Sequence, residues 1–457
     1  MWKRNYQRKM VIEDTIEARV RQYAETKPSK TAVVCGEEVI TYSELWDRVG
    51  QKATALKNNG VKEGSLYIFR SSQSPDFLIT YMAVHIIGAV AVPLERDCPE
   101  DTIKLIKESY GHKHLPQAEE PLENIADVLF TTGSTGKQKG VMESYRAINA
   151  NSDNLIKAQG FTKDTVFIIC GPLNHIGSLS KIWPTLMLGG TLIILEGMKD
   201  INALFDAFHY NSNHIATFMV PASIRIAIQL GAERLQEVAN KIEFMETGGA
   251  AISQTDIDTL RKLLPTTRLY NTYASTETGI VCTNDFNHDN PVMGCVGRPM
   301  PHSKVFITAE HTIACKGDTL MSGYLDDEAL TAEVLHDGTV FTTDLGEIDT
   351  DGCLHIKGRD NDVINIGGYK VSPLEVENIA NAFPAIAESI CCLTHSPIFG
   401  DTIKLVYSPK DGEKISKKEL ARFMAGQLEG YKLPRVFEQV PFLRHTYNGK
   451  LDRKSYR

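Results

Sequence analysis

The stretch best suited to chemistry runs over residues 130–140 and reads Phe-Thr-Thr-Gly-Ser-Thr-Gly-Lys-Gln-Lys-Gly. It follows a short apolar segment that fits a buried strand. Glycines let backbone N–H groups turn toward a ligand, hydroxyls add donors and lysines add positive charge. These groups suit a polyphosphate, although such a composition is also typical of flexible surface loops. The loop is not a Walker A motif, because Thr131 stands at the first glycine position and Gln138 follows Lys137.

Three further loops combine small, polar and charged residues, and each follows an apolar segment of strand type. They span residues 171–177, 247–251 and 271–279. In open α/β sheets, ligands bind in the crevice outside the carboxyl ends of the strands. We therefore expect these three loops and the 130–140 loop to meet around one ligand site.

The elements that must position these loops alternate between buried strands and helices. This alternation over 31–109 and again over 166–270 predicts an α/β fold with mostly parallel sheets. From Val296 onward, short strands separated by turn residues predict a small β subdomain. A polar, hinge-like stretch then leads into a compact α+β unit. We therefore expect a large domain over 1–360 and a small, mobile α+β domain over 361–457.

Composition and charge narrow the class of protein. The 457 residues carry a net charge of −8 without a basic stripe, so a nucleic-acid partner is not expected. The first ten residues lack an apolar core, and no apolar run reaches the roughly 18 residues of a membrane span. We therefore expect neither a secretory signal nor integral membrane association. Nine scattered cysteines without a C-x-x-C pair predict neither a disulfide framework nor a zinc site, and a reducing cytoplasm fits best.

Taken together, these stretches resemble the adenylate-forming (AMP-binding) superfamily of acyl-CoA synthetases, adenylation domains of nonribosomal peptide synthesis and luciferases. The resemblance covers nearly the whole chain. Residues 130–140 match the pattern (Y/F)-T-S-G-(S/T)-T-G-x-P-K-G, and residues 271–277 are similar to N-x-Y-G-x-T-E. Thr343-Asp344-Leu345 resembles T-G-D-L, Gly358-Arg359 resembles the G-R that opens the hinge, and Asn448-Gly449-Lys450 resembles the terminal G-K motif. The departures from the family patterns are Thr132, Gln138, Ala274 and Thr343.

The resemblance implies an enzyme that joins a carboxylate to the α-phosphate of ATP, releases pyrophosphate and then passes the acyl group to a thiol. Tyr273 would stack on adenine, with Gly249 and Ala250 lining its other side. Asp344 would accept hydrogen bonds from both ribose hydroxyls, with Arg359 nearby. The residues that would hold the β- and γ-phosphates are Thr131, Thr132, Gly133, Ser134, Thr135, Gly136 and Lys139.

The resemblance also assigns the catalytic groups. Thr276 would donate to the α-phosphate, and Glu277 would hold Mg²⁺, a hard cation that prefers oxygen ligands. Lys450 would bridge the substrate carboxylate and the α-phosphate. Because Lys450 lies near the chain end, the small domain would supply it for adenylation and rotate away for thiol attack, pivoting at Asn361.

The acyl side is identified from residues 172–177, which resemble the P-L-x-H-x-x-G stretch of acyl- and aryl-CoA synthetases. His175 would line or gate the acyl pocket. We find no nearby aspartate to pair the ammonium of an α-amino acid, so a simple carboxylate is favoured. The methyl group of Ala274 favours a small or planar acyl group. The candidate pocket residues are His175, Ile176, Ser178, Met219, Gly248, Ala274 and Gly279.

Three functions follow from these observations. The leading one is an AMP-forming ligase that uses ATP, Mg²⁺ and CoA to activate a small carboxylic acid. The second is an acyl- or aryl-adenylating enzyme that loads the phosphopantetheine of a carrier protein. The third is a non-catalytic nucleotide-binding relative, which the departures at Gln138, Ala274 and Thr343 would support. The retained residues that argue against it are Lys139, Glu277, Asp344, Arg359 and Lys450.

Overall fold

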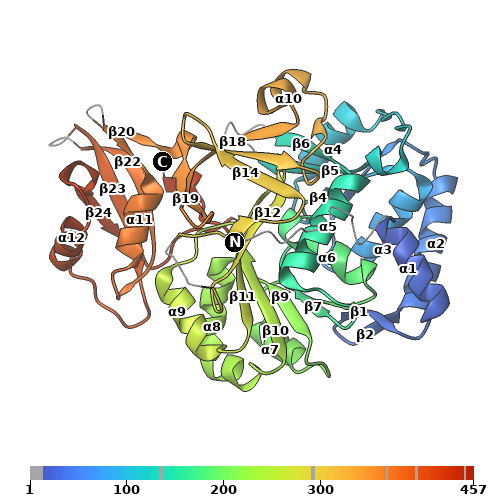
Figure 1. The fold of residues 1–457 in the computed structure, drawn as a ribbon, viewed down its shortest axis with the longest axis horizontal. Helices are drawn as coiled ribbons and strands as arrows, with labels where there is room; N and C mark the ends of the chain where they lie inside the picture. Colours follow the sequence, from blue (N-terminus) through green and yellow to red (C-terminus); the bar gives the residue numbers. More distant parts are fainter. Residues whose placement is uncertain are drawn as a thin grey trace.

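The computed structural model describes residues 14–132, 138–289, 294–366, 369–396, 400–446 and 449–456. Two large sheets with their helices, a small β subdomain and a C-terminal α+β unit make up this part of the chain (Figure 1). The fold is α/β, as the alternation of strands and helices predicts. The C-terminal unit lies at one end of the molecule, next to the small β subdomain (Figure 1).

The larger sheet has nine strands in the order β13-β12-β11-β10-β9-β7-β8-β1-β2. The six strands from β11 to β1 in this order run parallel, and antiparallel pairs close both edges. The loop at 171–177 follows β7, and the segment 247–251 begins with the last two residues of β10 and continues beyond it, so both lie at carboxyl ends of strands, as expected. The strands are β1 (Thr31–Cys35), β2 (Glu38–Thr41), β7 (Val166–Ile169), β8 (Thr191–Ile194), β9 (Ile215–Phe218), β10 (Ile242–Gly248), β11 (Arg268–Ser275), β12 (Gly279–Asp285) and β13 (Arg298–Pro299).

The expected loop at 271–279 is mostly strand. Residues 271–275 continue β11, and β12 begins at Gly279, so only residues 276–278 form the turn of an antiparallel hairpin. The sequence Asn-Thr-Tyr-Ala-Ser is polar, but its side chains meet those of β12 and of the small β subdomain. Cross-strand pairing therefore outweighs the turn-like composition.

The second sheet has five strands in the order β16-β6-β5-β4-β3. The expected loop at 130–140 is a hairpin here, because β5 reaches Thr132 and β6 begins at Gln138 before the chain enters helix α5. The prediction of a strand followed directly by loop and helix is therefore wrong. Val141 is buried on β6, which pairs with β5 on one side and with β16 on the other. The strands are β3 (Leu66–Arg70), β4 (Val90–Leu94), β5 (Ile125–Thr132), β6 (Gln138–Ser144) and β16 (Gly323–Tyr324).

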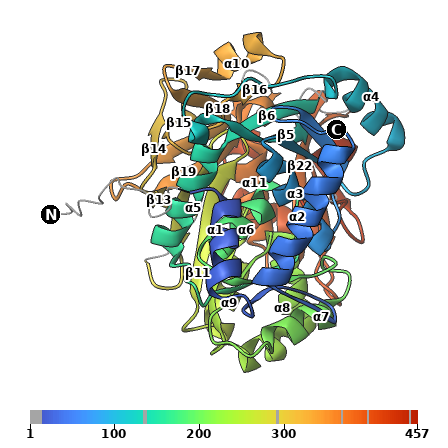
Figure 2. The ribbon, with the colours of Figure 1, turned by 90° about the vertical axis from the view of Figure 1, so that its right-hand side faces the viewer.

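Helices fill the space between the two sheets and cover the outer face of the larger one. A single apolar cluster joins residues of both sheets to α1, α2, α3, α5 and α6, and Figure 2 shows α1 beside α2. A second cluster packs α7, α8 and α9 on the other face. None of the helices in the described ranges is long and apolar enough to cross a membrane. The helices are α1 (Ile16–Thr26), α2 (Tyr42–Asn58), α3 (Pro75–Ile87), α4 (Glu100–Tyr110), α5 (Tyr145–Gln159), α6 (Ile176–Met187), α7 (Ile201–Phe208), α8 (Pro221–Glu237) and α9 (Gln254–Leu263).

The small β subdomain and the C-terminal unit follow in the chain. The subdomain contains α10 (Glu328–Val334) and β14 (Ser303–Ile307), β15 (Thr312–Gly317), β17 (Leu335–His336), β18 (Thr339–Ile348) and β19 (Leu354–Arg359). The C-terminal unit has its own apolar core. Its elements are β20 (Ile364–Ile366), β21 (Tyr369–Val371), α11 (Pro373–Asn381), β22 (Ile386–Ser396), β23 (Gly400–Pro409), α12 (Lys417–Ala425) and β24 (Val436–Gln439).

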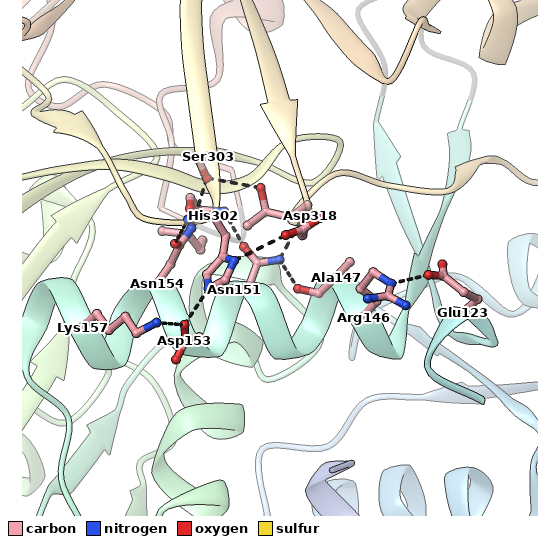
Figure 3. A network of polar contacts seen from close by, with 12 residues as sticks. Glu123, Arg146, Ala147, Asn151, Asp153, Asn154, Lys157, His302, Ser303 and Asp318 are labelled. Carbon is pink, nitrogen blue, oxygen red and sulfur yellow. Dashed lines mark hydrogen bonds and ion pairs between the residues drawn. The ribbon is translucent and has the colours of Figure 1, made fainter. Parts of the chain in front are cut away.

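Helix α5 fastens the β11–β12 hairpin to the start of the small β subdomain through buried polar side chains (Figure 3). The side chain of Asn151 accepts a bond from the N–H of Ile280 at 2.7 Å. Asp153 pairs with His302, with 2.5 Å between Oδ2 and Nε2, and this bond raises the pKa of His302. Because these buried polar groups hydrogen-bond to one another, helix α5 sets the position of the turn at 276–278.

A second buried network ties α1, α3 and β5 together. The imidazole of His85 lies between two carboxylates, with Nδ1 2.7 Å from Glu17 Oε1 and Nε2 3.0 Å from Asp127 Oδ1. The hydroxyl of Tyr81 donates to Asp127 at 2.7 Å and accepts from the indole N–H of Trp183 at 3.0 Å. Burial alone would lower the pKa of His85, but the two carboxylates outweigh it and raise the pKa to about 10. The folded protein therefore holds an imidazolium in its core.

We expect this imidazolium to make stability depend on pH. The pKa of His85 is higher in the folded state than the ordinary value of 6.5, so unfolding releases a proton between these two values. The contribution of His85 should be complete below about pH 6.5 and decline as the pH rises to about 10. Urea unfolding across this range should show the decline in the parent and not in His85→Gln, which should also be less stable at about pH 6. The same dependence of the free energy of unfolding on pH in both proteins would contradict the assignment of a positive charge to His85.

One cysteine pair corrects the expectation from the sequence. Cys295 and Cys353 form a disulfide with a Cα–Cα distance of 6.0 Å, while the other seven cysteines are free. The two residues are 58 positions apart, so no motif indicated the pair. They meet because Cys295 lies beside the start of β19, where it forms a bridge with His355.

Candidate active site

Three predicted nucleotide-binding residues from different strands meet, with two of them bonded to the carboxylate of the third. Asp344 on β18 and Arg359 on β19 are register partners, and Arg359 Nε lies 2.9 Å from Asp344 Oδ1. The hydroxyl of Tyr273 on β11 donates to Asp344 Oδ2 at 2.7 Å. The carboxylate raises the pKa of Arg359, and burial followed by the same carboxylate raises the pKa of Tyr273. The bond from Tyr273 to Asp344 had no signal in the sequence, where Tyr273 was assigned only to adenine.

Lys450 enters this group from the C-terminal unit. A Cβ at Gly249, just beyond β10, would lie 3.5 Å from Lys450 Cε. Gly449 has a φ of 75°, and a Cβ there would approach Val220 Cγ2 to 2.8 Å. Burial and the charge of Arg359 lower the pKa of Lys450, while carboxylates of the large domain oppose this shift. Gly449 therefore allows the close approach to Val220, and Gly249 marks where the lysine side chain meets the large domain.

His175 lies close enough to sense the charge of Lys450. It is the residue before α6, and its backbone N–H bonds the carbonyl of Pro172 at 3.2 Å. Burial, with a further contribution from Lys450, lowers the pKa of His175 to about 4. The imidazole is therefore neutral at physiological pH, which suits a wall residue and not a proton donor.

The turn between β11 and β12 places Thr276 and Glu277 beside the second sheet. The hydroxyl of Tyr324 on β16 donates to Glu277 Oε1 at 3.0 Å. The ammonium of Lys139 on β6 lies 5.4 Å from the centroid of the Tyr324 ring. A carboxylate has further acceptor positions after one such bond, so Glu277 fits as an oxygen ligand for Mg²⁺. Tyr324, which the sequence reasoning missed, thus lies between a candidate metal ligand and a candidate phosphate ligand.

The described part of the phosphate hairpin brings two predicted residues together. Thr131 on β5 is the register partner of Lys139 on β6. Thr132 belongs to β5 and Asn361 belongs to the short turn between β19 and β20, but their side chains are outside the description. The predicted residues that lie outside the described ranges are Gly133, Ser134, Thr135 and Gly136.

The acyl side of the site is built around Phe218, which sequence reasoning missed. A Cβ at Gly177, in the first turn of α6, would lie 2.9 Å from Phe218 Cε1, and a Cβ at Gly248 would lie 3.7 Å from Phe218 Cε2. Phe218 is half-buried, whereas its preceding neighbours on β9 are buried. Met219 was predicted at this wall, but it packs in the apolar cluster of α7, α8 and α9. Successive side chains of a strand point to opposite faces, which explains why Phe218, and not Met219, lies on the acyl side.

The other predicted acyl residues occupy several positions. Ile176 and Ser178 are buried in the first turn of α6, and Ala274 packs at the edge of the main cluster. Gly248 ends β10, and Ala250 is exposed beyond it. Gly279 has a φ of 68° and packs against Asn151, with the carbonyl of Thr319 2.6 Å from the position of a Cβ. This packing against α5 explains why residue 279 is a glycine, and a bound ligand is not needed to explain it.

A partly exposed ion pair joins the C-terminal unit to α8. Arg225 Nη1 lies 2.5 Å from Glu388 Oε1 on β22, and Arg225 Nη2 lies 3.1 Å from Asp256 Oδ2 on α9. His445 Nε2 lies 3.1 Å from the same oxygen of Glu388. The carboxylates outweigh the effect of burial and raise the pKa of Arg225. This contact joins the C-terminal unit, which carries Lys450, to the large domain.

Comparison with family models gives two matches that together cover most of the chain. The model described as AMP-binding enzyme matches residues 20–116 and 106–325. The model described as AMP-binding enzyme C-terminal domain matches residues 375–450.

Individual relatives agree with these matches. A 2-succinylbenzoate–CoA ligase of Staphylococcus aureus is 32% identical over 346 residues, which is 74% of this chain and 68% of that protein. An indoleacetate–CoA ligase of Aromatoleum aromaticum is 25% identical and is covered over 96% of both chains. Among solved structures, ATP-bound MatB from Rhodopseudomonas palustris has a TM-score of 0.84 at 24% identity, with 97% of this chain and 98% of that chain covered. The likeness to MatB shows that the two proteins share a fold.

Proposed function

The chain belongs to the AMP-binding enzyme family, and from that premise we propose that it activates a carboxylic acid with ATP and transfers the acyl group to the thiol of CoA. One observation carries the proposal. Lys450 of the C-terminal unit reaches Gly249 of the large domain, where the charges of Arg359, Asp344 and Glu277 act on it. Residues assigned to the ribose, the metal and the reacting carboxylate thus converge on one site.

Adenylation brings two anions together, so the site must neutralise charge. The ammonium of Lys450 would bridge the substrate carboxylate and the α-phosphate, and the hydroxyl of Thr276 would donate to the α-phosphate. Lys139 would hold the β- and γ-phosphates with the hairpin that follows Thr131. Attack of a carboxylate oxygen on the α-phosphorus then forms acyl-AMP and expels pyrophosphate.

The nucleoside would be held by the strands of the larger sheet and the small β subdomain. Asp344 would accept hydrogen bonds from both ribose hydroxyls, while Arg359 and Tyr273 hold that carboxylate in place. Tyr273, Gly249 and Ala250 would enclose the adenine. Glu277 would hold Mg²⁺, which would neutralise phosphate charge when bound.

We propose CoA as the acyl acceptor, because relatives that share 25–32% identity with this chain are CoA ligases. The C-terminal unit, over about residues 361–457, would rotate about Asn361 and withdraw Lys450 before the thiol attacks. The cytoplasm, where ATP and CoA are available, is the proposed location.

Pyrophosphate release from MgATP tests the function across aryl, short-chain and medium-chain carboxylates, each with and without CoA. We expect sustained release that requires both one class of acid and CoA. Release that an acid supports and CoA does not stimulate would point to a carrier-protein acceptor. A protein that binds ATP but releases no pyrophosphate with any acid would contradict the proposal.

Loosening the docking contact should separate the two half-reactions. In Arg225→Gln, the side chains of Glu388 and Asp256 lose their common cation, so the adenylation orientation should be less populated. We expect acid-dependent ATP–pyrophosphate exchange to fall about tenfold, a change of about 1.4 kcal/mol in population. Thioester formation from supplied acyl-AMP should be unchanged or faster.

The matched control is Arg234→Gln, an arginine on the same helix whose closest carboxylate, Asp206, is 3.8 Å away. This variant should behave as the parent in both assays. Equal losses of exchange and of thioester formation in Arg225→Gln would contradict a role in orientation.

A further inference from the structure

A second charged pair lies deep on the acyl side of the site. Lys181 on α6 and Glu246 on β10 are each 1% exposed, and Lys181 Nζ lies 2.9 Å from Glu246 Oε1. The ammonium is also 5.4 Å from the centroid of the Phe218 ring. Nothing in the adenylation chemistry described above uses these two residues.

The backbone places this pair behind the acyl wall. Lys181 is one helical turn after Gly177 and therefore faces the same side of α6. Glu246 and Phe218 are register partners on neighbouring parallel strands, so their side chains point to the same face of the sheet. Glu246 also lies two residues before Gly248, on that face. Phe218 thus stands between the two glycines of the acyl wall, with the charged pair adjacent to its ring.

The pair leaves hydrogen-bonding capacity unused. Glu246 Oε2 is buried and has no hydrogen-bond partner among the described residues. An ammonium carries three N–H donors, and one of these serves Glu246 Oε1. An unpartnered buried oxygen and a buried ion pair both cost free energy, and apolar residues would fill such a position at lower cost. A bound group that satisfies both partners would account for the arrangement.

The required group must donate one hydrogen bond and accept another. A hydroxyl can donate to Glu246 Oε2 and accept from Lys181 Nζ at the same time. A carboxylate would be repelled by Glu246, an ether could not donate, and an ammonium could not accept. We propose that the Lys181–Glu246 pair recognises a hydroxyl group at the far end of the carboxylic acid substrate.

The distance along β10 sets the length of that acid. Glu246 is two residues before the end of β10 at Gly248, a strand span of about 7 Å, and Gly249, which adjoins Lys450, follows directly. The proposed carboxylate position at Lys450 and the hydroxyl position are therefore separated by about one aromatic ring and its substituents. The ring of Phe218 and the methyl group of Ala274 offer apolar contacts for such a ring. The structure thus assigns the substrate to the hydroxylated aryl acids, an inference that rests on the proposed acid-activating function.

Matched acids test this inference in the unmodified enzyme. Acid-dependent ATP–pyrophosphate exchange should be measured with hydroxylated benzoic, phenylacetic and cinnamic acids, with their unsubstituted parents and with their methyl ethers. We expect kcat/KM for the hydroxylated member of the preferred series to exceed that of the other two at least tenfold, because a site built to bond a hydroxyl leaves polar groups unpaired without it. Equal or higher activity with the unsubstituted acid would overturn the inference and leave the proposed function intact.

A double variant identifies the residues responsible. Lys181→Met/Glu246→Leu replaces both charges with apolar side chains of similar size, which avoids an unpaired buried charge. We expect this variant to lose the preference for the hydroxylated acid while keeping exchange with the unsubstituted parent, and thermal unfolding should confirm that it is folded. An unchanged preference in the folded variant would show that the pair is only structural. The absence of exchange with every acid in the unmodified enzyme would instead reject the proposed function, and with it the inference.

Discussion

Lys450→Ala is expected to lower acid-dependent ATP–pyrophosphate exchange by at least a hundredfold while the protein remains folded. Removing a preorganised donor that stabilises transition-state charge typically costs factors of 10² to 10³. Lys450 is the charged group that the C-terminal unit brings into the field of Asp344 and Glu277. Its loss should leave two anions, the substrate carboxylate and the α-phosphate, without a bridging cation. Exchange measured at saturating ATP and acid gives the loss in kcat.

The variant has a matched control and a second readout. Lys454→Ala removes an exposed lysine four residues later and should leave exchange unchanged. Titration of ATP into Lys450→Ala should give a Kd close to that of the parent, because the proposed adenosine contacts lie on the large domain. Full exchange activity in Lys450→Ala would contradict the proposed mechanism.

Asp344→Ala is expected to raise the KM for ATP by about 100- to 10,000-fold, since two hydrogen bonds to a charged group contribute about 1.5–3 kcal/mol each and about 1.4 kcal/mol corresponds to a factor of ten. The same substitution leaves Arg359 Nε and the Tyr273 hydroxyl without their acceptor. Both effects act on nucleotide binding. The KM for the acid should change much less, which separates this variant from a general loss of folding.

Two further variants resolve the role of Asp344. Tyr273→Phe keeps the ring but removes the bond to Asp344, so it should raise the KM for ATP by less than Asp344→Ala does. Asp351→Asn alters an exposed carboxylate on the turn between β18 and β19 and should have no effect. An Asp344→Ala enzyme with an unchanged KM for ATP would show that the ribose does not bind at this carboxylate.

Much of the fold could be predicted from the sequence, because alternation and cap residues act locally. The capping box at the start of α2 is such a local device, because Thr41 and Glu44 stand at the spacing at which each side chain bonds the other's backbone N–H. The hairpin of β5 and β6 could not be predicted in this way, because Gln138 and Lys139 are polar and only their pairing with β5 makes them strand residues. The pair of Cys295 and Cys353 likewise depends on contacts between segments that are distant in sequence.

The candidate site also contains residues with a local sequence signal and residues that depend on contacts between distant segments. Motifs identified Asp344, Arg359 and Lys450, and the structure places all three together. Residues without a motif had no signal, and Phe218 and Tyr324 became visible only when their strands were paired. Because side chains alternate along a strand, only one of Phe218 and Met219 can face the acyl side. Met219 packs in the apolar cluster on the opposite face of the sheet, which leaves Phe218 on the acyl side.

Transfer of oxygen from the acid to AMP tests the central claim most directly. The enzyme should be incubated with MgATP, CoA and a substrate acid whose carboxylate carries ¹⁸O, and the AMP should be analysed by mass spectrometry. When a carboxylate oxygen attacks the α-phosphorus and the thiol then attacks the acyl carbon, that oxygen remains with AMP. We therefore predict AMP that contains one ¹⁸O atom for each thioester formed. Unlabelled AMP, or ADP and phosphate in its place, would contradict the account.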